Sequence, residues 1–164
     1  CLFLVGFSAE AQRQTAPVAS NKTIIIEIAP MEVDQMFSQP DGSRVDKYVR
    51  IHCGNHNEAP KQSHAEFTTL IEEGDVIEWK IKNHNIMGAI DITTVTLSRI
   101  QAHDDSITIF HENPLLVNNL VVSGTVTNAI NQHPMLYDIY INVINPQGSK
   151  TFVIDPKLAI KPHN

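Results

Sequence analysis

The sequence predicts an all-β protein whose strands form a Greek-key antiparallel β-sandwich of about eight or nine strands. Short segments carry an apolar residue at every second position, which is the period of a strand with one buried face. Turn-forming residues separate these segments, and no stretch of a dozen residues repeats with the 3.6-residue period of a helix. At most, residues 33–37 form one short helical turn. Regularly spaced strands without intervening helices are typical of a β-sandwich.

Four strands are predicted in the first half of the chain. The clearest is "GDVIEWKIK", in which Ile77, Trp79 and Ile81 face inward while the charged residues between them face water. The other three show the same alternation; they are "TIIIEIA" (23–29), "DKYVRIHC" (46–53) and "EFTTLIE" (66–72).

Five further strands are predicted in the second half. The last of them is stopped by Pro156, which cannot donate a hydrogen bond within a sheet. Glycine-containing turns are expected at 39–43, 72–75 and 145–149. The five strand segments are "DITTVTLSRI" (91–100), "SITIFH" (106–111), "LVVSGTVTN" (120–128), "YDIYINVIN" (137–145) and "KTFVIDP" (150–156).

The N-terminal segment differs in composition from the rest. "CLFLVGFSAEAQ" is an apolar run followed by small residues, with Ala9 and Ala11 placed as in a signal-peptidase cleavage motif. We therefore expect residues 1–11 to be the remnant of a signal peptide and the protein to be secreted or periplasmic. The alternative is a cell-surface lipoprotein that carries its lipid on Cys1.

The rest of the chain is expected to form one domain. Residues 12–21 are polar and contain a proline, so a flexible lead-in is expected there, followed by a single β-sandwich over residues 22–164. The apolar run at 2–7 is far shorter than the about 20 residues that span a bilayer, so no integral membrane span is expected in the mature chain.

The charge and the motifs of the sequence argue against a nucleic-acid-binding protein and against an enzyme. The net charge is −6 and the 12 Lys and Arg residues are dispersed, which is not the basic surface that nucleic acid requires. Hydrolase, metalloprotease, phosphate-loop and dinucleotide motifs are missing from the sequence, so we expect no catalytic residues and a protein that is not an enzyme.

The segment "IHCGNHNEAPKQSH" (51–64) is the best candidate for metal binding. Its imidazole and thiolate groups suit zinc or copper, although adjacent strand residues point to opposite faces unless the chain bulges. The competing interpretation is a strand end in which Cys53 points into the core, followed by a polar loop; under it no cofactor is bound. The candidate metal ligands are His52, Cys53, His56 and His64.

Two resemblances to known families accompany these patterns. "GDVIEWKIKNHN" resembles a strand of the cupredoxins, blue-copper β-sandwich proteins, and this resemblance would place a copper ligand at His84. The last 40 residues contain no cysteine, so the resemblance implies a cupredoxin- or Ig-like sandwich without the copper centre.

The order of "EEGDVIEWK", "VVSGTV", "YDIYINVI" and "KTFVIDPKLAI" is similar to that in the bacterial inclusion-body protein family. In that resemblance an Asp-Pro pair and a short apolar run follow the last strand, at Asp155, Pro156, Leu158 and Ile160.

We therefore expect an exported, non-catalytic protein that binds a protein partner or associates with itself at the cell surface, in the periplasm or outside the cell. The alternative is a periplasmic zinc- or copper-binding protein. Two long segments with apolar residues, 29–46 and 111–119, are the candidate contact surfaces, unless their apolar residues close the ends of the sandwich.

Overall fold

The computed structural model describes residues 19–53, 67–89, 91–104, 109–127 and 135–160, and these residues contain eleven strands, one α-helix and one 3-10 turn. The strands are β1 (Asn21–Ile28), β2 (Val49–Cys53), β3 (Thr68–Ile71), β4 (Val76–Ile81), β5 (Asn85–Met87), β6 (Ile92–Ala102), β7 (Leu115–Leu116), β8 (Val121–Thr125), β9 (Met135–Asn145), β10 (Gly148–Ile154) and β11 (Lys157–Ile160). The helix is α1 (Pro30–Phe37), and the 3-10 turn is η1 (Asp46–Tyr48).

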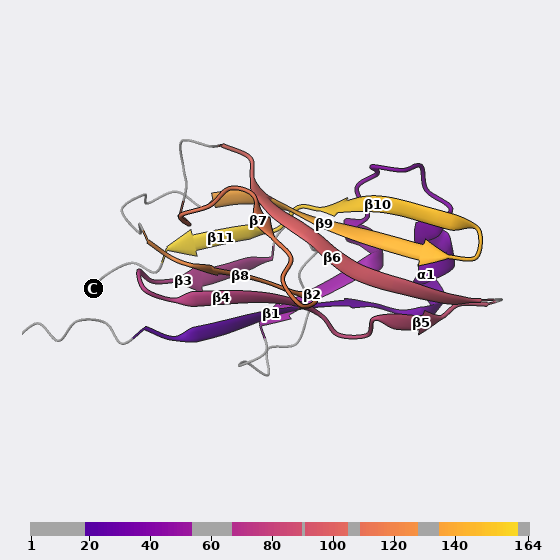
Figure 1. Ribbon diagram of the computed structural model, residues 1–164, viewed down its shortest axis with the longest axis horizontal. Helices are drawn as coiled ribbons and strands as arrows, with labels where there is room; N and C mark the ends of the chain where they lie inside the picture. Colours follow the sequence, from indigo (N-terminus) through magenta and orange to yellow (C-terminus); the bar gives the residue numbers. More distant parts are fainter. Residues whose placement is uncertain (1–18, 54–66, 90, 105–108, 128–134, 161–164) are drawn as a thin grey trace, which may run out of the picture.

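The strands form two sheets that face each other, which confirms the predicted all-β sandwich (Figure 1). One sheet has the order β2-β1-β4-β8, and the other has the order β3-β11-β9-β6-β5, with β10 also paired to β9 and β7 to β6. The sheets are mixed rather than wholly antiparallel, because β1 runs parallel to β4 and β11 runs parallel to β3.

The core lies between the inner faces of the two sheets. Ile77, Trp79 and Ile81 of β4 are buried, as their alternation predicted. β9 alternates in the same way, and the ring of Tyr137 meets that of Trp79 edge to face with centroids 5.9 Å apart. Burial of a large apolar side chain contributes about 1.5–3 kcal/mol, so each buried residue of this double row stabilises the sandwich by an amount of that order.

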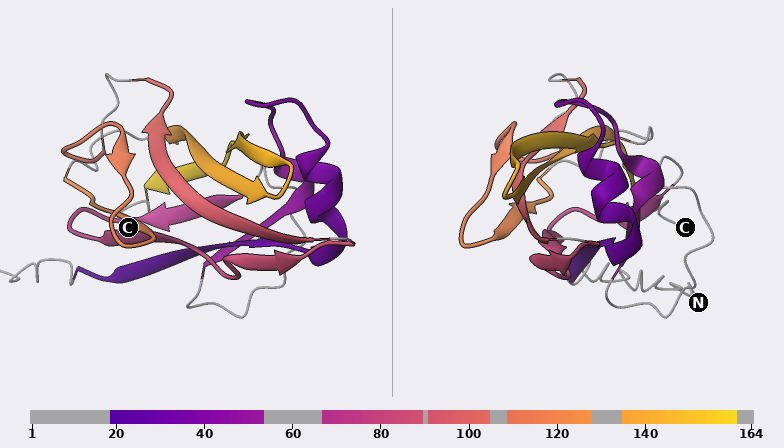
Figure 2. Two further views of the ribbon diagram at one scale, coloured as in Figure 1. Left: turned by 45° about the vertical axis from the view of Figure 1, so that its right-hand side comes forward. Right: turned by 90° about the vertical axis from the view of Figure 1, so that its right-hand side faces the viewer.

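The helix α1 closes one end of the sandwich (Figure 2). Pro30 occupies its first turn, where a proline is tolerated because that N–H has no helical partner. Val33, Met36 and Phe37 are buried. The single helical turn expected at 33–37 is thus the second half of a longer helix. The alternative given for this segment, that its apolar residues close the sandwich end, is confirmed for Val33, Met36 and Phe37.

Two strand predictions also need correction. Pro156 does not end the sheet: the chain bends there and continues as β11, which pairs with β9 and β3. Residues 109–111 of the expected strand 106–111 form bends, and residues 106–108 lie outside the described residues.

The outer edge of β10 is covered by the segment that precedes η1. Arg44 forms a parallel bridge to Val153, and the Val45 N–H donates to the Val153 carbonyl at 2.9 Å. A covered edge cannot pair with a strand of another chain.

The expected signal-peptide remnant, residues 1–11, and most of the expected lead-in, residues 12–21, lie outside the described residues, and both remain predictions. Asn21 already belongs to β1. In the described ranges no helix has the length and apolar character needed to cross a membrane.

Candidate functional site

His52 and Cys53, two of the four predicted metal ligands, are the last residues of β2. The register places Cys53 opposite Ile24, which is fully buried, and His52 opposite Ile25. Because neighbouring strand residues point to opposite faces, β2 does not direct the thiol and the imidazole toward one point. The Cys53 thiol is free and half-buried. His56 and His64 lie outside the described residues, so the four-residue site stays a prediction.

His84, the residue that the cupredoxin resemblance singled out, lies between β4 and β5. Its Nδ1 is 3.2 Å from the backbone carbonyl oxygen of Val95, and the Val95 N–H donates to the His84 carbonyl at 2.7 Å. The imidazole thus adds a contact between the two arms of the β5–β6 hairpin.

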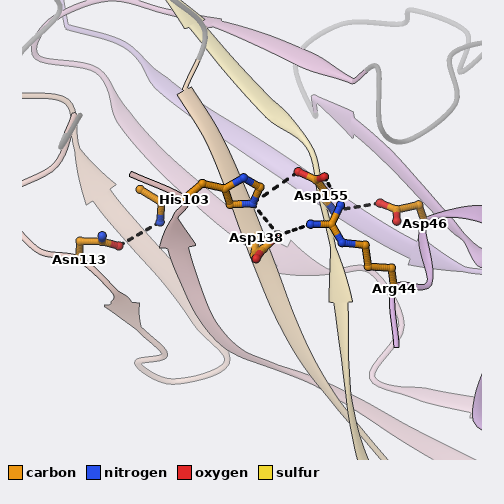
Figure 3. Close-up of polar contacts among 7 residues, drawn as sticks. Arg44, Asp46, His103, Asn113, Asp138 and Asp155 are labelled. Carbon is orange, nitrogen blue, oxygen red and sulfur yellow. Dashed lines mark hydrogen bonds and ion pairs between the residues drawn. The ribbon is translucent and has the colours of Figure 1, made fainter. Parts of the chain in front are cut away.

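A group of charged side chains gathers where β6, β9 and the β10–β11 joint meet (Figure 3). His103 follows the last residue of β6, Asp138 lies in β9, and Asp155 stands between β10 and β11. Arg44 and Asp46 approach from the segment that covers the β10 edge. We call these five residues the His103 cluster.

Backbone hydrogen bonds position His103. Its N–H donates to the Leu136 carbonyl at 3.0 Å, which continues the β6–β9 ladder one residue past the end of β6. The Ala102 N–H donates to Asn113 Oδ1 at 3.0 Å, which holds the end of the strand from the other side (Figure 3). These two bonds therefore fix the backbone of His103 beside β9.

The ring of His103 faces two carboxylates. Its Nε2 is 2.8 Å from Asp138 Oδ1 and 3.7 Å from Asp155 Oδ1. The Asp155 N–H donates to Asp46 Oδ1 at 2.9 Å, which fixes the kinked backbone before Pro156. These contacts join segments that are far apart in the sequence.

Arg44 supplies the positive charge of the cluster. Its guanidinium forms an ion pair with Asp155, and its Nη2 is 3.8 Å from Asp138 Oδ1. Desolvation by itself lowers the pKa of Arg44, but the carboxylates of Asp155, Asp138 and Asp46 outweigh it and raise that pKa. The guanidinium is therefore a permanent cation among three acidic residues.

No sequence pattern marks these residues as a site, although Asp155 belongs to the Asp-Pro pair of the inclusion-body resemblance. His103, Asp138 and Asp155 have no motif spacing, because strand pairing and a chain bend bring them together. The available signals were the position of His103 at a strand end and the Asp155–Pro156 step, and neither identifies the other members.

The second predicted contact surface, 111–119, is divided by the structure. Leu115 is buried, whereas Leu116 is 66% exposed, Val117 41% and the nearby Leu120 51%. Asn118 and Val121 exchange backbone hydrogen bonds, so residues 118–121 form a tight turn that presents these side chains. We call Leu116, Val117 and Leu120 the apolar tip.

A small apolar hollow beside β6 and β9 has a volume of about 10 Å³, the space of about one water molecule. Ile100, Phe110 and Met135 are among the side chains that line it. Pockets that hold small organic ligands are at least about 300 Å³, so this hollow is not such a site.

The arrangement of the described strands defines a two-sheet β-sandwich protein with a charged cluster and an apolar tip. Its fold is similar to that of an inclusion body protein, PixA, from Burkholderia cenocepacia J2315, whose crystal structure gives a TM-score of 0.60 at 10% sequence identity. The match covers 95% of this chain and 100% of that chain. No protein-family model matches the sequence, and no curated protein is detectably similar to it.

At 10% identity the likeness concerns the fold alone. It supports the predicted resemblance to the inclusion-body family at that level. It lends no support to the cupredoxin resemblance.

Proposed function

We propose that this chain is an exported, non-catalytic β-sandwich protein that associates with copies of itself. The observation that carries the proposal is the fold likeness over nearly the whole chain to a protein described as an inclusion body protein. Self-association of folded copies requires a contact between their surfaces, so the proposal calls for a contact surface on this chain.

The apolar tip is the surface we assign to that contact. Leu116, Val117 and Leu120 lie within five residues of one another on one hairpin, and each exposes more than two-fifths of its surface. Leu120 also adopts a left-handed conformation, with φ 69°, which costs an L-residue about 1–2 kcal/mol. An exposed leucine held in that conformation contributes little to the monomer, and burial against another molecule would offset its cost.

The size of the apolar tip suits weak association. Three aliphatic side chains cover much less than the roughly 800 Å² per partner that a stable interface buries. The tip alone would therefore not hold a dimer at low concentration. A contact between two tips would close as a dimer, so an extended assembly requires the tip to contact a different surface of the next copy.

Export is the second half of the proposal. It rests on the apolar run and the Ala9 and Ala11 pattern in residues 1–11, and it places the mature protein in the periplasm or outside the cell. N-terminal sequencing of the protein recovered from a periplasmic extract tests it. A mature N-terminus near Gln12 is expected, and an uncleaved N-terminus in the cytoplasmic fraction would contradict export.

Light scattering coupled to size-exclusion chromatography over a wide concentration range tests self-association. The apparent molar mass of the wild type should rise with concentration, while that of the Leu116→Ser/Leu120→Asn variant stays at the monomer value. Met31→Ser is the matched control, because Met31 is 88% exposed but lies on α1, away from the apolar tip. A wild type that remains monomeric up to its solubility limit would contradict the proposal.

A further inference from the structure

We propose that His103, Asp138 and Asp155 form a binding site for one divalent transition-metal ion of the zinc type. This inference does not depend on the proposed self-association, and it concerns residues different from the predicted ligands at 52–64. It rests on the geometry of three ligand atoms, on one buried oxygen and on the charge of the surrounding side chains.

The three ligand atoms are close enough to share an ion. His103 Nε2 and one carboxylate oxygen from each aspartate lie within 4.8 Å of one another. Zinc binds nitrogen and oxygen at about 2.0–2.2 Å, so ligand atoms around a tetrahedral ion are roughly 3.3 Å apart. The measured separations of 2.8 and 3.7 Å from Nε2 to the two carboxylates bracket that value. Small side-chain rotations would complete the geometry.

The environment of Asp155 Oδ1 is the second observation that favours a bound cation. This oxygen is buried and has no hydrogen-bond partner, while the other oxygen of the same carboxylate is paired with Arg44. A buried oxygen without a partner costs about 1–3 kcal/mol, and more when it carries charge. A metal ion between Oδ1 and the His103 ring would satisfy it.

The charges around the site match a divalent cation. Asp46, Asp138 and Asp155 contribute three negative charges and Arg44 one positive charge, so the cluster carries −2 when His103 is neutral. The Asp138 and Asp155 side chains are only 17% and 20% exposed. A partly buried carboxylate is more costly without a positive partner than an exposed one, so a bound cation would stabilise both. Neutral imidazole is also the form of histidine that binds a metal.

Arg44 and Asp46 would act as positioning residues. The Arg44 guanidinium holds Asp155 Oδ2, which leaves Oδ1 directed toward His103. Asp46 accepts a hydrogen bond from the Asp155 backbone and so fixes the chain on which this ligand is carried. Outer contacts of this kind commonly orient the carboxylate ligands of a metal. The opposing interpretation is an ion-pair network that needs no metal, in which Arg44 and a protonated His103 are the cations.

One imidazole and two carboxylates favour Zn²⁺ over Mg²⁺ or Ca²⁺. The latter two ions prefer sites made wholly of oxygen, and Ca²⁺ requires six or more ligands. Three protein ligands leave a fourth position for water, as in zinc sites that are open to solvent.

The test is a zinc titration of the full chain without a histidine tag, read by competition with a chromophoric chelator at pH 7. We expect one ion per chain and a rise in Tm with zinc. His103→Ala and Asp155→Asn should each weaken binding at least about tenfold. His111→Ala is the matched control, since His111 is an exposed histidine of the described chain outside the cluster, and it should bind like the wild type.

Three results would overturn the site. One is wild-type binding weaker than about 100 µM. Another is unchanged binding in His103→Ala with loss in Cys53→Ser, which would assign the ion to residues 52–64. A third is equal loss in His111→Ala, which indicates scattered surface histidines. Circular dichroism checks that each variant is folded, and Asp138→Asn replaces any variant that is not.

Discussion

The indole N–H of Trp79 donates a hydrogen bond to the Tyr137 hydroxyl at 3.2 Å, and both side chains are fully buried between the two sheets. Burial raises the pKa of Tyr137, and the bond from Trp79 offsets only part of that effect. The phenol therefore stays neutral and serves as the acceptor that the buried indole requires.

Tyr137→Phe should destabilise the protein by about 1–3 kcal/mol, because the Trp79 N–H is then buried without a partner. Urea unfolding followed by Trp79 fluorescence measures the change; Trp79 is the only tryptophan of the chain. Tyr140→Phe is the control, since Tyr140 is half-exposed beneath the Arg99 guanidinium. Equal losses of unfolding free energy in the two variants would contradict a stabilising role of the buried hydrogen bond.

Asp75 should make stability depend on acid pH. It is buried, accepts bonds from Ser20 and the Glu72 N–H, and pairs with Lys22 at 2.5 Å. Desolvation by itself raises the pKa of Asp75, but these partners lower it to about 2. Because the folded pKa lies below the unfolded value, the stabilisation is present above about pH 4 and is lost as the pH falls toward 2.

The pKa difference of Asp75 corresponds to about 2 kcal/mol. Asp75→Asn should therefore lower the free energy of unfolding by at least that order at pH 7 and flatten its fall between pH 4 and pH 2. Glu73→Gln, at an exposed neighbouring position, is expected to stay within about 0.5 kcal/mol of the wild type at pH 7. A variant of Asp75 that keeps the acid slope would contradict the assignment.

Lys150 caps the C-terminal end of α1 from the neighbouring strand β10. Its Nζ donates to the Phe37 carbonyl at 2.7 Å and to the Gln39 carbonyl at 2.8 Å, and it lies 4.8 Å from the centre of the Phe37 ring. The last turn of α1 has no basic residue of its own, so this ammonium replaces one.

Lys150→Met keeps the aliphatic stem and removes these bonds, and it should cost about 1.5–3 kcal/mol. Hydrogen exchange should rise first in α1, because the helix then loses its attachment to β10. Lys47→Met, at an exposed lysine above the Tyr48 ring, is the matched control. Unchanged exchange in α1 would contradict the capping role.

Leu120→Asn should stabilise the monomer and weaken its association. Asparagine tolerates the left-handed conformation better than leucine, so the free energy of unfolding should increase by about 0.5–1 kcal/mol. Leu116→Asn removes a similar side chain from the apolar tip without relieving a left-handed residue, so it should weaken association with no gain in stability. Thermal unfolding and light scattering on the two variants separate these effects.

The sequence predicted the sandwich well where one face of a strand is buried. β4 and β9 alternate between buried and more exposed residues, and the face that each strand buries follows from that alternation. α1 was underestimated because eight residues are too few for a clear helical period, and Ala29 provides no side-chain cap. The parallel pairings of β1 with β4 and of β3 with β11 depend on tertiary contacts that no local pattern encodes.

The candidate sites differ in how far the sequence could reveal them. The 52–64 cluster is prominent in the sequence, yet strand geometry points His52 and Cys53 apart. His103 and its carboxylates are inconspicuous in the sequence, because their proximity requires the β6–β9 register and the bend at Pro156. Proximity in the sequence thus drew attention to His52 and Cys53, which β2 directs to opposite faces. The folded chain instead brings together His103, Asp138 and Asp155.

The central position of β1 determines when the nascent chain can fold. β1 lies between β2 and β4, so its second edge stays unpaired until residues 76–81 have been synthesised. The facing sheet requires β9, β10 and β11, so the isoleucines of β1 remain uncovered until most of the chain has left the ribosome. Such a chain stays unfolded late into its synthesis, with the apolar face of β1 still accessible to other molecules.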